Sequence, residues 1–572
     1  MIGSQPRWYR SPYGVRLSQL LMSAYRHHLF EEPSGRRLRE TTKMNRKTLV
    51  LPALTGVLAV AVAGCGGDQD SSADAEAIVV GTTDHFEVTK ETPAPFDPAA
   101  SYSVASWNVL RNTYQTLLRL PRSGTEPEPE AAEQCSFTDS NNEQFRCTVR
   151  DDLTFSNGNK LDAKDVEFSV KRMVAIDDPN GPASLLSNLD RVEAPSDTEV
   201  VFHLKKPDAT FPYKVATPAV AIVDDEVYPA DGLYEGTEIA ASGPYALDSF
   251  EEEKATFVKN AGYRGKVDFN NEKIEMRFFP DGDKLEAALR EGEVDVVNRT
   301  LAPEQVRKLE SVDGINVQGL PSQGIRYLVF NTDKPAVEDE AVRKAVAQLV
   351  DRQALVRDVY DRTAEPLYSI VPGGLPGHRN SFFNSYGEPD KGEAQELLEN
   401  AGIQTPVELE FTYTSDYYGS ATKGEFEMIR DQLNRSGLFE VTVKGEPWQT
   451  YRPNATDRKY EVYGMGWFPD FPDAENFIAP FFGENNFLNS PYRSSEIIDD
   501  LLPLSRTRTE RTAANEDFIK IQDIVAEEVP VLPLWQSKQY VVAKEEITGV
   551  EWALNSSSVL QLWELGRGAT LE

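Results

Sequence analysis

Leu153–Val174 reads LTFSNGNKLDAKDVEFSVKRMV and carries two local structure signals in succession. The SNG sequence within it is typical of a turn. Asp162 follows the turn and can cap a helix, because its side-chain oxygen can accept a backbone N–H of the first helical turn. The stretch therefore predicts a turn and then an amphipathic helix, whose apolar face carries Val166, Val170, Met173 and Val174.

Strand and helix patterns alternate on both sides of this stretch. AIVVGTT at 77–83 predicts a strand, and the residues from Trp107 to Leu118 predict an amphipathic helix. Further on, the strand IEMRFFP leads into the helix DKLEAALREG and the strand VDVVN. Short connections between such elements indicate an α/β protein.

The second half of the chain continues the alternation. The strand IRYLVFNT is followed by one long predicted helix at 337–360, with acids early and bases later, as the helix dipole prefers. A helix is also predicted from Asn515 to Glu528, followed by the apolar run VPVLPLW and the strand QYVVA.

Length and charge limit the classes of function. The chain has 572 residues and a formal charge of −33, so a large core and more than one domain are expected. An acidic surface argues against nucleic-acid binding, because that requires cations that neutralise phosphates. It also argues against a basic patch that binds the membrane surface.

The N-terminal region carries an export signal. MNRK at 44–47 is basic, the residues at 48–62 are uncharged and apolar, and VAGC ends at Cys65. VAGC resembles the bacterial lipoprotein box, in which the cysteine is lipidated and becomes the mature N-terminus. We therefore expect a precursor segment at 1–64 with its true start at Met44, and a flexible tether at 65–77. An uncleaved anchor or an ordinary signal peptide is the alternative.

Cys135 and Cys147 flank CSFTDSNNEQFRC, which reads as two short strands around a turn. An exported protein folds in an oxidising compartment, so a disulfide between them is predicted. A metal or redox site is the alternative, but the spacing is not that of a CxxC motif.

Catalytic and metal-binding patterns are not evident in the sequence. His85, His203 and His378 are scattered, and no nucleophile elbow, P-loop or dinucleotide fingerprint occurs. DDPNG at 177–181 reads as a turn rather than a calcium loop. Asp470 and Asp473 could form the carboxylate pair of a hydrolase. The inventory favours a binding protein without a cofactor or metal over an enzyme.

Gly466–Phe482 reads GWFPDFPDAENFIAPFF and sets acids among aromatic rings. Its three prolines forbid a continuous helix and would remove donors from a central strand. The segment is neither an amphipathic helix nor a clean alternating strand.

Several segments together resemble the extracellular solute-binding proteins of the peptide/nickel class, the substrate receptors of dipeptide and oligopeptide ABC importers. The signature stretch at 153–174 is similar to that family's. Five further segments occur in the family's order: FDPAASYSVASWNVLRNTYQTLLR, SGPYAL, IRYLVFNTDKPAVEDEAVRKAVAQLVDRQALV, GWFPDFPDAENFIAPFF and VPVLPLW.

The resemblance implies an α/β, two-lobed, periplasmic-binding-protein-like fold of class II with an extra α+β domain on lobe one. Lobe one would comprise 78–112, 238–322 and 535–572. The extra domain would be 113–237, and lobe two 323–534. The chain would cross between the lobes near Ser322 and Trp535.

The resemblance also implies a site between the lobes. Asp470 occupies the position that receives the α-ammonium of a bound peptide. A carboxylate among rings and prolines is poorly solvated, so a bound ammonium would restore a partner. Asp473 and Glu475 are expected instead to cap the helix that begins near Ala474. Other implied ligand-binding residues are Gly466, Trp467, Phe468, Tyr102 and Val104, with Trp107 and Phe471 as apolar walls.

One position departs from the family pattern. Some oligopeptide receptors have an arginine two residues before the G-W glycine, and here that residue is Gly464. The residue that binds a ligand carboxylate is therefore unassigned, with Arg379 and Arg493 as candidates by charge alone.

The expected protein is a monomeric, lipid-anchored receptor on the extracellular face of the cell membrane. It would bind peptides or other small solutes and deliver them to the ABC importer permease, with no nucleic-acid partner. Three alternatives stay open: a receptor for a nickel chelate, haem or oligosaccharide, a signalling receptor for a peptide pheromone, and a secreted hydrolase.

Overall fold

A computed structural model describes residues 76–568, except 300, 485, 556 and 558. The precursor segment 1–64 with Met44, the lipidation residue Cys65 and nearly all of the tether lie outside the described residues. Within the described part, none of the helices is both long and apolar enough to cross a membrane.

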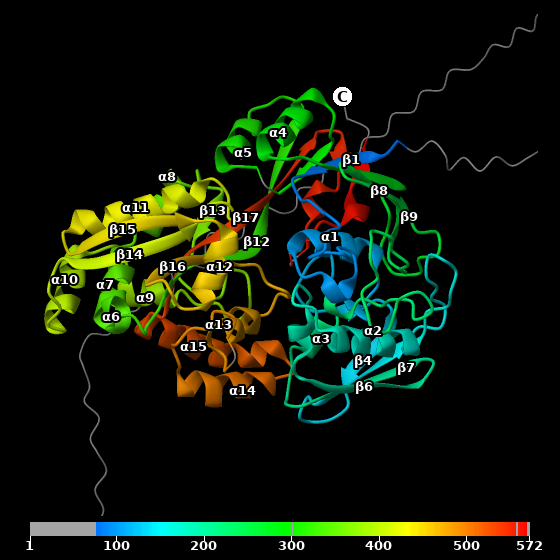
Figure 1. Ribbon diagram of the computed structural model, residues 1–572, viewed down its shortest axis with the longest axis horizontal. Coiled ribbons are helices and arrows are strands. Elements are labelled where there is room, and N and C mark those ends of the chain that lie inside the picture. Colours follow the sequence, from blue (N-terminus) through cyan, green and yellow to red (C-terminus); the bar gives the residue numbers. More distant parts are fainter. Residues whose placement is uncertain (1–75, 300, 485, 556, 558, 569–572) are drawn as a thin grey trace, which may run out of the picture. The chain divides into compact units, whose positions relative to one another are not determined.

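One large sheet of eleven strands forms the centre of the structure (Figure 1). Its order is β15–β14–β16–β12–β17–β11–β1–β10–β9–β8, and β13 pairs with β17 beside this path. The strands are β1 (Ile78–Thr82), β8 (Tyr245–Glu251), β9 (Lys254–Lys259), β10 (Lys273–Phe278), β11 (Val296–Asn298), β12 (Ile315–Phe330), β13 (Ala364–Pro366), β14 (Val407–Thr414), β15 (Phe439–Glu446), β16 (Val462–Trp467) and β17 (Val531–Lys544).

β12 and β17 are the long strands that join the two halves of this sheet. They pair antiparallel, with β11 beside β17 on one side and β16 beside β12 on the other. Their register is interrupted between Pro321 and Ile325. The predicted crossing residues Ser322 and Trp535 lie in these two strands. The lobe boundaries themselves stay a prediction.

The predicted cysteine hairpin belongs to a separate four-stranded sheet of order β4–β5–β7–β6. Its strands are β4 (Ala132–Phe137), β5 (Gln144–Val149), β6 (Leu189–Ser196) and β7 (Glu199–Leu204). Cys135 and Cys147 face each other across β4 and β5 and are joined by a disulfide. α2 (Ala163–Ile176) packs on β6 and β7, so this part of the chain is α+β.

α2 begins where the sequence predicts. Asp162 accepts the N–H of Lys164, and Asp165 accepts the N–H of Asp162, which together form a capping box. Val166 and Val170 are buried, but Val174 is 45% exposed, so its placement on the apolar face is wrong.

The single long helix predicted at 337–360 is instead three helices: α6 (Pro335–Glu338), α7 (Glu340–Leu349) and α8 (Arg352–Asp358). Asp339 and Asp351 have extended backbone angles and cap the next helix, accepting the N–H of Ala341 and Ala354. Aspartate favours this cap because its oxygen satisfies a donor that has no partner within the helix.

The first predicted helix is displaced toward the N-terminus. α1 spans Val104–Thr113 rather than Trp107 to Leu118. Ser103 caps it by accepting the N–H of Ser106, and Tyr114 returns the backbone to an extended conformation.

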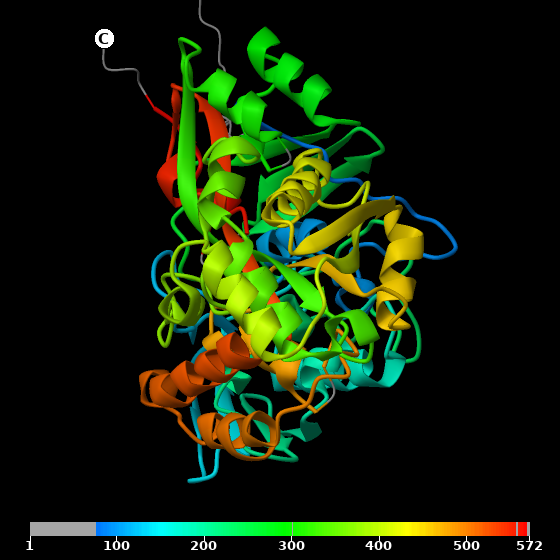
Figure 2. The same ribbon diagram turned by 90° about the vertical axis from the view of Figure 1, so that its left-hand side faces the viewer.

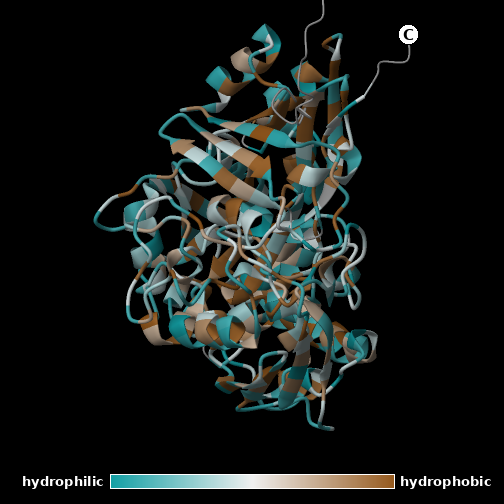
Figure 3. Ribbon diagram, turned by 90° about the vertical axis from the view of Figure 1, so that its right-hand side faces the viewer, coloured by the Kyte–Doolittle hydropathy of each residue, from teal (hydrophilic) through white to brown (hydrophobic). Residues whose placement is uncertain are grey.

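α15 (Asn515–Glu528) has the predicted bounds. It packs beside α14 (Leu502–Arg506), as Figures 1 and 2 show. Many helices carry both hydrophobic and hydrophilic segments, as expected for helices that cover a sheet (Figure 3). The remaining α-helices are α3 (Phe211–Lys214), α4 (Gly282–Glu291), α5 (Pro303–Leu309), α9 (Ser381–Tyr386), α10 (Lys391–Asn400), α11 (Ala421–Ser436), α12 (Trp448–Thr456) and α13 (Ala479–Phe482).

A buried ion pair links the segment before α1 to α2. Arg172 donates from Nη1 and Nη2 to both carboxylate oxygens of Asp97, at 2.9 and 2.5 Å. The two side chains are 2% and 0% exposed. Asp97 also accepts the N–H groups of Ala99 and Tyr234, so its carboxylate holds three segments together.

We expect Asp97→Ala to destabilise the protein by about 3–5 kcal/mol, because it leaves the Arg172 guanidinium buried without its anion. Chemical denaturation followed by circular dichroism measures this loss. The control is Glu193→Ala, which removes the exposed partner of Arg191 and should leave the unfolding midpoint unchanged. Equal effects of the two substitutions would contradict the expectation.

Candidate functional site

The GWFPDFPD segment leaves the large sheet at the end of β16. β16 ends at Trp467, and Asp473 then accepts the N–H of Glu475 to cap a short 3-10 helix at Ala474–Phe477. The backbone N–H of Asp470 donates to Asn476 Oδ1 at 2.9 Å. The residues between strand and helix are thus held in an irregular loop at the end of a central strand.

Asp470 is buried at the centre of this loop, with 6% of its surface exposed. One carboxylate oxygen accepts the Tyr102 hydroxyl at 2.7 Å, and the other accepts Asn476 Nδ2 at 3.0 Å. Burial raises the pKa of the Asp470 carboxyl above its ordinary value, and the two hydrogen bonds only partly oppose this. The carboxylate is therefore poorly solvated, as the sequence suggests.

Tyr102 is predicted to lie on the other side of the site, and its hydroxyl contacts Asp470 although the two residues are 368 positions apart. The Tyr102 ring packs on Trp107, with ring centres 5.4 Å apart. Trp107 is buried and donates its indole N–H to the Ser101 carbonyl. Val104 is half-buried at the first position of α1.

The predicted aromatic residues have three different environments. Trp467 packs edge-on against Phe481 and Phe487, and Phe468 is 46% exposed. Phe471 is buried against Leu120 and Tyr213, which belong to the segment predicted as the extra domain.

The carboxylates of Asp473 and Glu475 both form ion pairs with arginines. Arg511 donates to both oxygens of Asp473 at 2.7 and 2.9 Å. Arg506 donates to Glu475 at 2.7 Å. Asp473 caps the short helix as expected, whereas Glu475 lies in the first turn of that helix and forms this ion pair instead of a cap. The carboxylate of Asp473 is thus committed to structure.

The two arginines proposed for a ligand carboxylate each contact other groups of the protein. Arg379 pairs with Asp523 at 3.4 Å, and Arg493 donates to the carbonyls of Ser490 and Tyr492. At Gly464 a Cβ atom would lie 2.5 Å from the Phe426 ring, so the family's arginine does not fit there without a shift.

Sequence reasoning missed a second buried charge next to the site. Arg326 lies on β12 opposite Gly466 on β16, and Trp535 faces it on β17. Its guanidinium carbon lies 3.6 Å from the ring centre of Tyr418 and 5.2 Å from that of Trp535. The only available signal was a charge inside the otherwise apolar strand IRYLVFNT.

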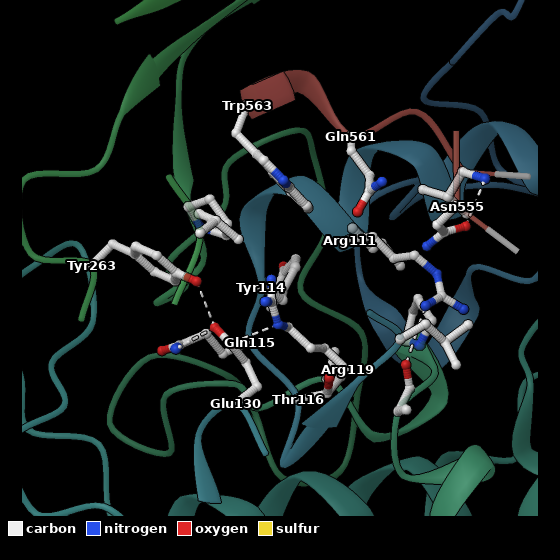
Figure 4. A pocket seen from close by; sticks show the side chains of 18 residues that line it. Arg111, Tyr114, Gln115, Thr116, Arg119, Glu130, Tyr263, Asn555, Gln561 and Trp563 are labelled. Carbon is white, nitrogen blue, oxygen red and sulfur yellow. Dashed lines mark hydrogen bonds and ion pairs between the residues drawn. The ribbon is translucent and has the colours of Figure 1, made fainter. Parts of the chain in front are cut away.

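A cavity lies beside α1, where Leu110 and Arg111 line it, and Figure 4 shows its lining side chains. Tyr263 and Gln115 donate to the same oxygen of Glu130, at 2.7 and 3.0 Å. Arg111 also lines the cavity, and burial lowers its pKa to about 10, although the nearby Asp470 carboxylate opposes this. Its Nη1 donates to the Ala216 carbonyl at 3.2 Å.

Within the described residues, one group of acids has the geometry of a possible metal site: Asp165, Asp224 and Asp225. Asp165 already accepts two backbone N–H groups, and Asp224 accepts the side-chain amides of Asn157 and Asn159. Protein donors thus satisfy two of the three carboxylates.

Comparison with known proteins places this arrangement in a family. The model of the bacterial extracellular solute-binding proteins, family 5 Middle, matches residues 126–489. The probable D,D-dipeptide-binding periplasmic protein DdpA of Escherichia coli is 24% identical, covering 80% of this chain and 89% of that protein. The oligopeptide-binding protein OppA of Bacillus subtilis is 23% identical, covering 88% and 96%.

Solved structures confirm the predicted fold class. The periplasmic binding protein DppA of Helicobacter pylori, in complex with the peptide STSA, aligns with a TM-score of 0.72. It is 20% identical, and the alignment covers 86% of this chain and 98% of that one. HbpA2 of Haemophilus parasuis aligns with a TM-score of 0.74 at 20% identity, covering 86% and 100%. The fold is therefore the α/β, two-lobed, periplasmic-binding-protein-like fold.

We expect Asp470→Asn to stabilise the ligand-free protein at neutral pH relative to the wild type. A carboxyl whose pKa is raised by folding costs stability when it is ionised, and that cost disappears as it becomes protonated. The difference should be largest at neutral pH. It should shrink as the pH falls through the raised pKa of Asp470 toward about 3.9, the value of an unfolded aspartate.

Thermal unfolding of both proteins between pH 3.5 and 8 measures the difference, at roughly half-unit steps chosen around that window. A gap that stays constant with pH would show that Asp470 is not desolvated as described.

Proposed function

Because the chain belongs to the bacterial extracellular solute-binding proteins of family 5, we propose that it is the membrane-tethered receptor of an ABC importer. It binds peptides between its two lobes and delivers them to the permease. Proteins of this family bind substrates and are not enzymes. The hydrolase alternative is therefore set aside, consistent with the occupied carboxylate of Asp473.

One observation carries the choice of an amine-bearing ligand: the buried carboxylate of Asp470. Its two oxygens each accept one hydrogen bond from the protein, whereas an ionised carboxylate has about four acceptor positions. An α-ammonium group supplies both the missing donors and the opposite charge. A charge-assisted hydrogen bond of this kind contributes about 1.5–3 kcal/mol.

The surrounding residues support an extended peptide. β16 ends at Trp467, so the backbone groups of Gly466 and Phe468 lie at a strand end, where a peptide can add by strand pairing. Phe468 is exposed, and Tyr102 contributes a ring from the other side. These residues, with Val104, Trp107, Trp467 and Phe471, are the proposed ligand contacts.

Lobe closure completes the proposal. The lobes are those expected from the resemblance: 78–112, 238–322 and 535–572 for lobe one with the extra domain at 113–237, and 323–534 for lobe two. The hydrogen bond between Tyr102 and Asp470 then joins the two lobes. Bending would occur where β12 and β17 lose their regular register.

The printed names of other relatives include heme-binding protein A of Haemophilus influenzae and glutathione-binding proteins. A solved relative holds agropinic acid. The first experiment is therefore mass spectrometry of any ligand that co-purifies with the wild-type protein, which distinguishes a peptide from a non-peptide solute.

We expect short peptides with a free amine to bind the wild type more tightly than the same peptides after N-acetylation. Asp470→Asn should weaken binding of the free-amine peptides by roughly 10- to 150-fold, since it removes one charge-assisted hydrogen bond. Isothermal titration calorimetry with di- to pentapeptides measures both effects.

The control for this titration is Asp333→Asn, which changes an exposed aspartate paired with Arg458 and should leave affinity unchanged. If free-amine and acetylated peptides bind the wild type equally well, the role of Asp470 is refuted.

The lipid anchor is a separate part of the proposal and rests on the VAGC motif. In a bacterial host, we expect the wild-type chain in the membrane fraction and Cys65→Ser in the soluble exported fraction. Mass spectrometry of the N-terminal peptide should show an acylated Cys65, and Cys135→Ser serves as the control that keeps the anchor. An unmodified Cys65 in a membrane-bound chain would contradict the assignment.

A further inference from the structure

Arg326 is a buried cation for which the described residues provide no hydrogen-bond acceptor. It is 6% exposed, and its Nε and Nη1 atoms are buried without a partner. No ion pair within 4.0 Å joins Arg326 to a carboxylate among the described residues. Burying an uncompensated charge is costly, so proteins rarely leave such a group without an anion.

Three other buried arginines of the described chain have conventional partners. Arg172 pairs with Asp97, Arg343 donates to four backbone carbonyls, and Arg352 donates to the Pro533 carbonyl. The fold thus supplies acceptors for buried guanidinium groups elsewhere. Arg172 and Arg352 also lie against aromatic rings, so Arg326 differs from them in having no acceptor among the described residues.

Glu425 is a buried acid close enough to sense the charge of Arg326, but it is held by other donors. One of its oxygens accepts the Tyr360 hydroxyl and, at 3.3 Å, the indole N–H of Trp535. Its other oxygen is buried without a partner. Burial raises the pKa of Glu425, and the positive charge of Arg326 lowers it only in part. Glu425 therefore attracts Arg326 across a gap without bonding to it.

The rings of Tyr418 and Trp535 lie close to the Arg326 guanidinium in cation–π contacts. Cation–π contacts leave the N–H groups in the plane of the guanidinium free to donate. A planar guanidinium with a free edge binds carboxylates well, because two parallel N–H groups match two carboxylate oxygens.

Arg326 also lies against the proposed peptide site. At Gly466 a Cβ atom would come within 3.0 Å of Arg326 Nη1 and 3.1 Å of the Tyr418 ring. Glycine at 466 is therefore what lets the guanidinium approach the strand end that carries Trp467 and Phe468. Arg326 faces Gly466 near the end of β16, and Asp470 lies in the loop that follows that end.

From these contacts we propose that Arg326 binds a carboxylate of the bound solute. The inference deepens the proposed function and rests on it: Asp470 binds the ammonium end of a peptide, and Arg326 binds its terminal carboxylate. Tyr418 and Trp535 are positioning residues that fix the plane of the guanidinium.

The test compares matched pairs of di- to pentapeptides with free N-termini, prepared as C-terminal acids or as amides, by isothermal titration calorimetry. Wild-type protein should prefer the acid form of the best-fitting length by roughly 10- to 100-fold. Arg326→Met should bind acid and amide forms equally. Arg326→Lys should retain part of the preference, because it keeps the charge but loses the planar fork.

Arg379→Met is the matched control, since Arg379 is a half-exposed arginine paired with Asp523, and it should keep the acid preference of the wild type. Wild-type protein that binds acids and amides equally well refutes the role of Arg326 but leaves the peptide-receptor function intact.

If the wild type binds no peptide at all, the proposed function is refuted. A second measurement tests Arg326 even then. Ligand-free Arg326→Met should unfold at the same temperature as the wild type or higher, because the substitution removes an unpaired buried charge. With an unchanged or higher unfolding temperature and no peptide binding, Arg326 is still inferred to bind a carboxylate, that of a non-peptide solute. A clear fall in melting temperature would show that Arg326 is a structural partner of Glu425, and would overturn the proposal.

Discussion

The pairing of β12 with β17 is the constraint on which the rest of the structure depends. These two strands connect the strands on the β11 side of the large sheet with those on the β16 side. Because they are hydrogen-bonded to each other, sliding one along the other would break the ladder. Bending where the register is already interrupted, between Pro321 and Ile325, breaks far less. The sheet thus permits one main kind of movement and opposes others.

The same pair of strands positions the charged groups of the site. β12 carries Arg326, and β17 carries Trp535, whose ring lies near that guanidinium. β16, the neighbour of β12, delivers the loop with Asp470. A cation and an anion are both buried among rings in this region, where water cannot compensate them. Such preorganised, desolvated groups bind a solute of opposite charge pattern strongly, because little solvent has to be removed from them on binding.

Local patterns predicted local features of this chain well. The capping box before α2, the bounds of α15 and the cysteine hairpin each depend on residues close together in sequence. The sequence predicts one helix at 337–360, but the structure has three. Asp339 and Asp351 could each either continue a helix or cap a new one, and only packing decides between these. The sequence does not predict the buried Arg326 for a similar reason, since its surroundings include Tyr418 and Trp535, which are distant in sequence. Tyr102 and Asp470 were placed in one site by resemblance, and their distance comes from the structure alone.

Contacts outside the site connect the segment 113–237 to the segment 323–534. The N–H of Ala209 donates to the Arg506 carbonyl at 2.9 Å, and the Thr509 hydroxyl donates to Asn142 Oδ1 at 2.9 Å. None of these bonds is to a solute, so they form whatever solute is bound. If the lobes part as proposed, these contacts have to break before release, whichever solute is bound. Selection among solutes and retention of the chosen one are then set by separate parts of the protein.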